Sequence, residues 1–68
     1  MKRLKVKDII EDRRFGHMVR VIRMQAKVTR KELADLMEIT SSYLYDLERG
    51  YRHWSPRLKQ QFKKAVNL

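Results

Sequence analysis

The sequence predicts an all-α protein, a compact bundle of four to five helices. Apolar residues recur at the spacing of one helix face, and the clearest series is Phe15, Val19, Ile22 and Ala26. Two strong helix-start signals follow, at Thr29 and at Ser55 with Pro56. No stretch alternates polar and apolar residues as a half-buried strand does, so we expect helices joined by short loops.

The length and composition predict one small domain without a metal or a cofactor. A chain of 68 residues buries only about 60% of its unfolded surface, so its core must be compact or completed by a partner. It has no cysteine and two histidines, which leaves no disulfide and no thiolate metal site. No apolar run approaches the ~18 residues of a membrane span, and acidic residues rather than an apolar segment follow the basic start MKRLKVK. We therefore expect a cytoplasmic protein without a signal peptide.

The charge balance favours a polyanion as partner. Lys and Arg outnumber Asp and Glu by 17 to 8, which gives a net charge of +9 at pH 7. Such a surplus on a small domain is typical of proteins that bind nucleic acid. Two other interpretations are a basic surface without a partner and an affinity for anionic lipid. The lipid interpretation is weaker, because no helix joins a wide apolar face to an all-basic face.

The chain divides into a basic N-terminal arm or short helix, residues 1–14, and a folded domain, residues 15–68. Residues 7–14 have helical character, and a clearer helix is expected over residues 15–27. Gly16 is a potential break between them. One kinked helix and two separate helices both remain open.

A capping pattern defines the start of the next helix. Thr29 and Glu32 form a capping box, in which the hydroxyl accepts from the Glu32 backbone N–H and the carboxylate accepts from the Thr29 N–H. The buried side of this helix is expected to consist of Leu33, Ala34 and either Met37 or Leu36. Glu38 and Ile39 then form a tight turn.

Another helix, residues 40–49, follows the turn. Its expected N-cap is Thr40, with Ser41 as the second candidate. Leu44 and Leu47 lie three residues apart on its buried side. Gly50 suits the left-handed position that ends a helix.

The last helix starts at Ser55, an N-cap followed by proline at the first helical position. Its apolar residues are Leu58, Phe62, Ala65 and Val66. Trp54, at the end of the basic and aromatic loop 51–54, is expected to cover this helix as a lid on the core. The residues expected to fill remaining core space are Met18, Met24 and Met37.

The two central helices meet the requirements of a helix-turn-helix motif. The motif needs a small residue where the helices cross, a compact turn, and apolar residues that bridge both helices. Ala34 is the small residue, and Ile39 is buried in the turn. The bridging residues are Leu44 and Leu47. The residues left for the outer face of the second helix are Ser41, Ser42, Tyr43, Tyr45 and Asp46.

The segment ELADLMEITSSYLYDLERG, residues 32–50, resembles the helix-turn-helix family of Cro and repressor proteins, also called the xenobiotic-response-element type. The following YRHWSP is similar to the family's basic loop and proline-started fourth helix, so the resemblance covers residues 15–66. It implies a lambda-repressor-like bundle whose helix-turn-helix domain, residues 15–68, binds double-stranded DNA. Glu38 departs from the family's usual glycine, so a strained left-handed residue or a shifted turn is expected there.

The resemblance also implies roles for individual residues. The expected contacts to base edges are Ser41, Ser42, Tyr43 and Asp46. The expected contacts to the DNA backbone are Arg30, Tyr45, Arg49, Arg52 and His53. Arg23 and Glu48 are expected to form a partly buried structural ion pair.

Simpler interpretations exist for several of these residues. Asp46 is equally suited to a local ion pair with Arg49 or Arg20. The tyrosines are alternatively packing residues. Neither histidine has a cysteine or acidic residue at metal-ligand spacing, so neither metal binding nor catalysis is expected.

The expected function is that of a sequence-specific transcriptional regulator, a repressor of phage or mobile-element type that is associated with the nucleoid. One small module buries too little surface for selective binding, so a homodimer on a two-fold-related operator is expected. The residues expected at the dimer surface are Phe62, Val66 and Leu68. The alternative is a protein-interaction module, such as an antitoxin or accessory factor, which the apolar segment Leu4–Ile10 would serve. No enzymatic site and no small-molecule site is evident.

Overall fold

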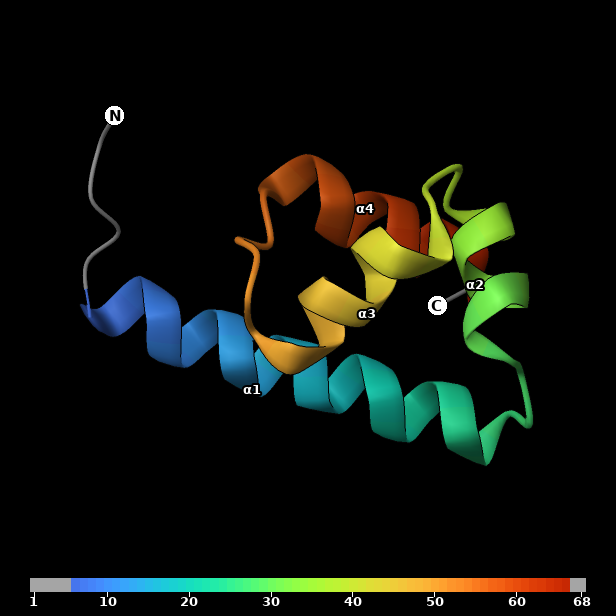
Figure 1. Cartoon of the computed structure of the whole chain (residues 1–68), viewed down its shortest axis with the longest axis horizontal. Coiled ribbons are helices and arrows are strands. Elements are labelled where there is room, and N and C mark those ends of the chain that lie inside the picture. Colours follow the sequence, from blue (N-terminus) through green and yellow to red (C-terminus); the bar gives the residue numbers. More distant parts are fainter. Residues whose placement is uncertain (1–5, 67–68) are drawn as a thin grey trace.

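The computed structural model describes the backbone of residues 6–66 and the side chains from Ile9 onward. It contains four helices and no strand over this range, which confirms the predicted all-α fold. The helices are α1 (Val6–Gln25), α2 (Arg30–Leu36), α3 (Ser41–Arg49) and α4 (Pro56–Ala65). Figure 1 shows α1 as one long rod along one side of the molecule, with the three shorter helices packed above it.

The first helix is continuous, so the open question about Gly16 is settled in favour of a single helix. Because α1 begins at Val6, the expected division between residues 14 and 15 lies inside it. Gly16 is a point where the backbone of α1 lies against the backbone of α3. A Cβ atom at this position would clash with the backbone carbonyl oxygens of Leu47 and Glu48. The glycine therefore allows two backbones to touch, which offsets its poor helix propensity.

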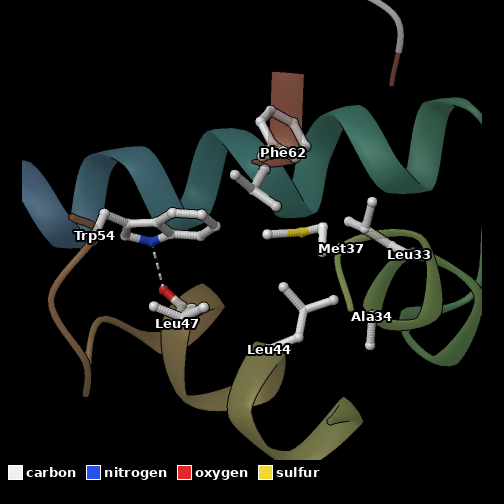
Figure 2. Packing of buried hydrophobic residues seen from close by; sticks show 8 residues of the cluster. Leu33, Ala34, Met37, Leu44, Leu47, Trp54 and Phe62 are labelled. Atoms are coloured by element: carbon white, nitrogen blue, oxygen red, sulfur yellow. Dashed lines mark hydrogen bonds between the residues drawn. The ribbon is translucent and has the colours of Figure 1, made fainter. Parts of the chain in front are cut away.

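The core lies between α1 and the three short helices (Figure 2). Its buried members are Val19, Leu33, Ala34, Met37, Leu44, Leu47, Trp54 and Phe62. Trp54, in the loop before α4, is buried in the core as expected, and its indole Nε1 donates to the Leu47 carbonyl oxygen at 3.0 Å. Its ring centroid lies 4.7 Å from that of Phe15, and the Phe15 and Phe62 rings meet edge to face at 6.0 Å. The aromatic cluster joins α1 to α4.

Three of the residues expected in the core are exposed instead. Met18 and Met24 are 40% and 57% exposed, and Ala26 is exposed beyond the end of α1. The reason is that α1 is covered on one side only, so residues on its other faces remain in contact with solvent. Of the two alternatives in α2, Met37 is buried, whereas Leu36 is 61% exposed.

Three helices end with a residue in the left-handed conformation. Lys27, Glu38 and Gly50 have φ values of 57°, 60° and 80°. In each case the next residue donates its backbone N–H to a carbonyl five residues earlier, at 3.0, 3.0 and 2.8 Å after α1, α2 and α3. This pattern is the Schellman motif, which normally uses glycine. Glu38 therefore adopts the strained left-handed conformation, and the tight turn between α2 and α3 is retained.

The predicted N-caps are all formed. The Thr29 hydroxyl accepts from the Glu32 N–H at 3.1 Å, and Glu32 accepts from the Thr29 N–H at 3.1 Å, which completes the capping box. Thr40 rather than Ser41 caps α3, accepting from the Tyr43 N–H at 3.0 Å. These local bonds fix the residues at which α2 and α3 begin.

Candidate nucleic-acid interface

The outward face of α3 is polar and is bordered on both sides by arginines. Leu44, Leu47 and Glu48 are buried, so the helix turns its opposite face to solvent. That face carries the exposed residues Ser41, Ser42 and Arg49 and the half-buried Asp46. The expected base-contacting residues therefore share one surface, although Tyr43 lies at its edge and packs partly against the core.

One border of this face is built around Tyr45. The guanidinium carbon of Arg30, at the start of α2, lies 4.7 Å from the centre of the Tyr45 ring, and that of Arg49 lies 5.1 Å from it. Such cation–π contacts restrain long side chains without neutralising their charge. The residues Arg30, Ser41, Ser42, Tyr45 and Asp46 line an open hollow of about 230 Å³.

The other border is built around Tyr43. The guanidinium carbon of Arg52 lies 5.2 Å from the centre of the Tyr43 ring, and its Nε lies 3.6 Å from Asp46 Oδ2. Asp46 thus has a local partner, as the simpler interpretation held, but the partner is Arg52 rather than Arg49 or Arg20. This exposed pair restrains Arg52 beside α3.

A buried ion pair supports the Arg30 border from below. Arg23 Nε and Nη2 donate to the two Glu48 carboxylate oxygens at 2.8 and 3.2 Å, and Arg23 Nη1 donates to the Val28 carbonyl oxygen at 3.1 Å. Arg30 Nε lies 3.7 Å from Glu48 Oε1, beyond hydrogen-bond distance but close enough for charge attraction. The Glu48 side chain is only 3% exposed, so its buried charge requires a compensating charge. The two arginines supply it.

His53, expected to contact the DNA backbone, also has a protein partner. Its Nδ1 lies 3.0 and 3.1 Å from the two carboxylate oxygens of Asp12, and one of these oxygens accepts from the Trp54 N–H at 3.0 Å. Asp12 belongs to the segment expected to be an arm, and sequence reasoning missed it. A signal was present, since Asp12, Gly16, Val19 and Arg23 follow one face of α1.

Glu32, in the first turn of α2, has a pKa shifted by its capping partner. Hydrogen bonds from the backbone and hydroxyl of Thr29 lower the pKa of Glu32 below its ordinary value. The ionised carboxylate lies in the first turn of α2, where the helix dipole favours negative charge. Over the described residues, no His, Asp and Glu side chains gather as a metal site would require.

The comparison with known families agrees with this geometry. Residues 19–58, more than half of the chain, match the helix-turn-helix family of the Cro/C1 type. The chain belongs to this helix-turn-helix family. No curated protein is a significant match. The family assignment makes the protein a DNA-binding transcription regulator, in which α2 and α3 form the helix-turn-helix.

The match begins inside α1 and ends in the first turn of α4, so it includes Arg23 and Trp54, which both bond to α3, but neither Asp12 nor Gly16. Within residues 6–66, no helix has the length and apolar character needed to cross a membrane.

Proposed function

We propose that this helix-turn-helix protein is a sequence-specific repressor of phage or mobile-element type that reads the major groove of double-stranded DNA with α3. The observation that carries the proposal is the pair of arginine-on-tyrosine contacts, Arg30 on Tyr45 and Arg52 on Tyr43, on opposite borders of one polar helix face. A major groove about 12 Å wide admits a single helix and has a phosphate backbone along each wall. Arginines on both borders would meet those two backbones while the face between them meets base edges.

The proposed contacts follow from this placement. The groove floor would meet Ser41, Ser42 and Asp46, with Tyr43 at one wall. The phosphates would meet Arg30, Tyr45, Arg49, Arg52 and His53. Serine hydroxyls discriminate bases weakly because they donate and accept, whereas Asp46 can accept from a cytosine amino group. We therefore expect affinity to come from the arginines, and selectivity to depend on DNA shape as well as on direct contacts.

We further propose that the protein binds as a homodimer at the nucleoid. A single module of this size buries too little DNA surface for tight and selective binding. The expected dimer surface needs revision, because Phe62 is 1% exposed and belongs to the core. Leu68 lies outside the described residues. Val66 remains at the surface, in an apolar hollow of about 280 Å³ between the ends of α1 and α4, beside Ile22 and Ala65.

In vitro selection from a random duplex pool tests this function directly. A dimer should select two inverted half-sites about 10 base pairs apart, or a multiple of that spacing. Sedimentation equilibrium of the selected duplex with the protein gives the stoichiometry. A 1:1 complex on a single half-site would remove the homodimer from the proposal, and failure to enrich any sequence would remove sequence-specific binding.

A second candidate is a protein-interaction module, an antitoxin or accessory factor on the same fold. It is favoured by exposed apolar residues on α1 outside the core, which are Ile9, Ile10, Met18, Val21 and Met24. Salt dependence separates the two functions. When a protein binds DNA through phosphates, log K falls linearly as the logarithm of the salt concentration rises. The slope is about 0.9 per contacted phosphate. Absence of salt-sensitive DNA binding, together with tight binding of a protein partner, would favour the interaction module.

A further inference from the structure

Asp12 is a buried carboxylate on α1 that holds the loop after the recognition helix. Its side chain is 5% exposed, and its Oδ1 accepts from the Trp54 backbone N–H at 3.0 Å. Both of its oxygens contact Nδ1 of His53, at 3.0 and 3.1 Å. Trp54 is itself anchored by its bond to Leu47. The carboxylate therefore fixes both the loop backbone and the orientation of the His53 ring.

This contact determines which nitrogen of His53 carries a proton. An ionised carboxylate only accepts hydrogen bonds, so Nδ1 must donate to Asp12. In the neutral ring Nε2 is then an acceptor, whereas in the imidazolium form Nε2 also donates. The His53 side chain is 47% exposed, and its Nε2 has no hydrogen-bond partner within the described range. Nε2 is thus available to an external group.

Arginines border the loop that carries His53, and their charge favours an anion as that external group. Arg52 precedes it on the same loop and is turned toward Asp46 of α3. Arg13 of α1 packs against Gly50, at the start of the loop. The first charged residue of α4, Arg57, is exposed. Asp12 already faces the ring on its inner side, so an anion on the outer side would complete the coordination of an imidazolium.

We propose that Asp12 is a positioning residue for DNA binding, which holds His53 so that the protonated ring donates from Nε2 to a DNA phosphate. The inference rests on the proposed DNA-binding function. Only the imidazolium can donate from both nitrogens, so a phosphate bound at Nε2 favours the protonated ring over the neutral ring. Because the complex then binds more protons on average than the free protein, the dissociation constant falls as the pH falls. The effect spans the range in which histidines titrate, about pH 8 to 5.

Fluorescence anisotropy with a labelled mixed-sequence duplex of about 20 base pairs measures this dependence at constant low ionic strength. The wild-type dissociation constant should fall several-fold between about pH 8 and 6, with a limit of about tenfold per pH unit for each protomer. His53→Gln should remove the pH dependence. His17→Asn is the matched control, because it removes the other histidine, which is exposed on α1, and it should retain the wild-type profile.

Asp12→Asn tests the positioning role. It keeps an oxygen for the Trp54 N–H but removes the charge that pairs with the imidazolium, so the gain in affinity on acidification should shrink. Nitrogen-15 NMR gives a direct readout: the neutral ring in the free protein should carry its proton on Nδ1, and the ring in the complex should be protonated on both nitrogens. If Asp12→Asn does not fold, the His53→Gln variant and the NMR measurement on wild type still test the role of His53.

The results of these experiments separate the role of His53 from the proposed DNA-binding function. Duplex binding with the same pH profile in wild type and His53→Gln would overturn the role of His53, and so would a neutral His53 ring in the complex. Absence of duplex binding at every pH, even at low salt, would overturn the proposed function together with this inference.

Discussion

Glu48 of α3 and Arg23 of α1 form a bidentate ion pair with hydrogen bonds of 2.8 and 3.2 Å. Only 3% of the Glu48 side chain and 11% of the Arg23 side chain are exposed. The pair closes the core beneath α3 and also places a negative charge 3.7 Å from Arg30 Nε. A structural contact in the core is thereby coupled to an arginine at the border of the candidate DNA-binding face.

Removing one partner of this pair should be strongly destabilising. Glu48→Ala leaves the Arg23 guanidinium without its carboxylate, and we expect the free energy of unfolding to fall by about 3 kcal/mol. A double variant, Arg23→Met with Glu48→Leu, should lose less than the sum of the single variants, because no buried charge is left alone. Urea denaturation of wild type, Arg23→Met, Glu48→Leu and the double variant measures the coupling. The exposed pair offers the control, since Arg52→Ala should change stability by less than about 1 kcal/mol. Additive single effects would contradict a coupled buried pair.

The two non-glycine residues in the left-handed conformation should be sites of stabilisation. Lys27→Gly and Glu38→Gly relieve a strain of about 1 kcal/mol each, partly offset by the greater chain entropy of glycine, so a small rise in melting temperature is expected. Gly50→Ala should do the opposite and lower stability by about 1–2 kcal/mol, since the new side chain would also press on Arg13. Thermal denaturation followed by circular dichroism compares the three variants. A lower melting temperature for Glu38→Gly would mean that its side chain contributes more than its backbone strain removes.

Gly16→Ala should be severely destabilising, although alanine is the better helix former. The new methyl group would collide with two backbone carbonyl oxygens of α3, which cannot move aside as a flexible side chain can. We expect a loss of about 2 kcal/mol or more. The adjacent exposed residue provides the control, because His17→Ala should be neutral or slightly stabilising. Equal stability of the two variants would show that α1 can shift away from α3.

The capping box should make stability depend on pH in the acidic range. The pKa of Glu32 is lowered in the folded state by its hydrogen bonds to Thr29, from an ordinary value of 4.5. Its contribution is therefore present above that value and is lost as the pH falls through the lower folded pKa. Wild type should be more stable than Glu32→Gln near neutral pH, and the difference should shrink toward about pH 3. Thr29→Ala should cost about 1 kcal/mol. A difference that is constant across this range would contradict the assigned shift.

Two substitutions on the candidate interface should separate affinity from specificity. Arg52→Ala should weaken binding to all duplexes similarly and reduce the salt slope by about one unit. Ser42→Ala should alter base preference with little effect on stability, because the side chain is exposed. Tyr43→Ala is a less clean test, since Tyr43 packs against the core and its loss should also destabilise the fold. A lower melting temperature for Ser42→Ala would contradict the assignment of Ser42 to the exposed outer face of α3.

The elements defined by local chemistry could be predicted from the sequence. The caps at Thr29, Thr40 and Ser55, and the left-handed end at Gly50, depend on hydrogen bonds among residues a few positions apart. The spacing of Ala34, Leu44 and Leu47 likewise predicts the helix-turn-helix motif, because each of its helices has one buried face. The polar surface of α3 follows from the same periodicity.

The tertiary structure decided what happens where two helices meet. Gly16 is a contact point rather than a break, and Asp12 belongs to the folded body, because α3 and its following loop cover that face of α1. Met24 is exposed and Phe62 is buried for the same reason: an apolar residue is buried only if another element covers it, and its own sequence neighbourhood does not contain that information. The partner of His53 was equally hidden, because Asp12 lies 41 residues earlier in the chain and comes close only when the loop after α3 packs against α1.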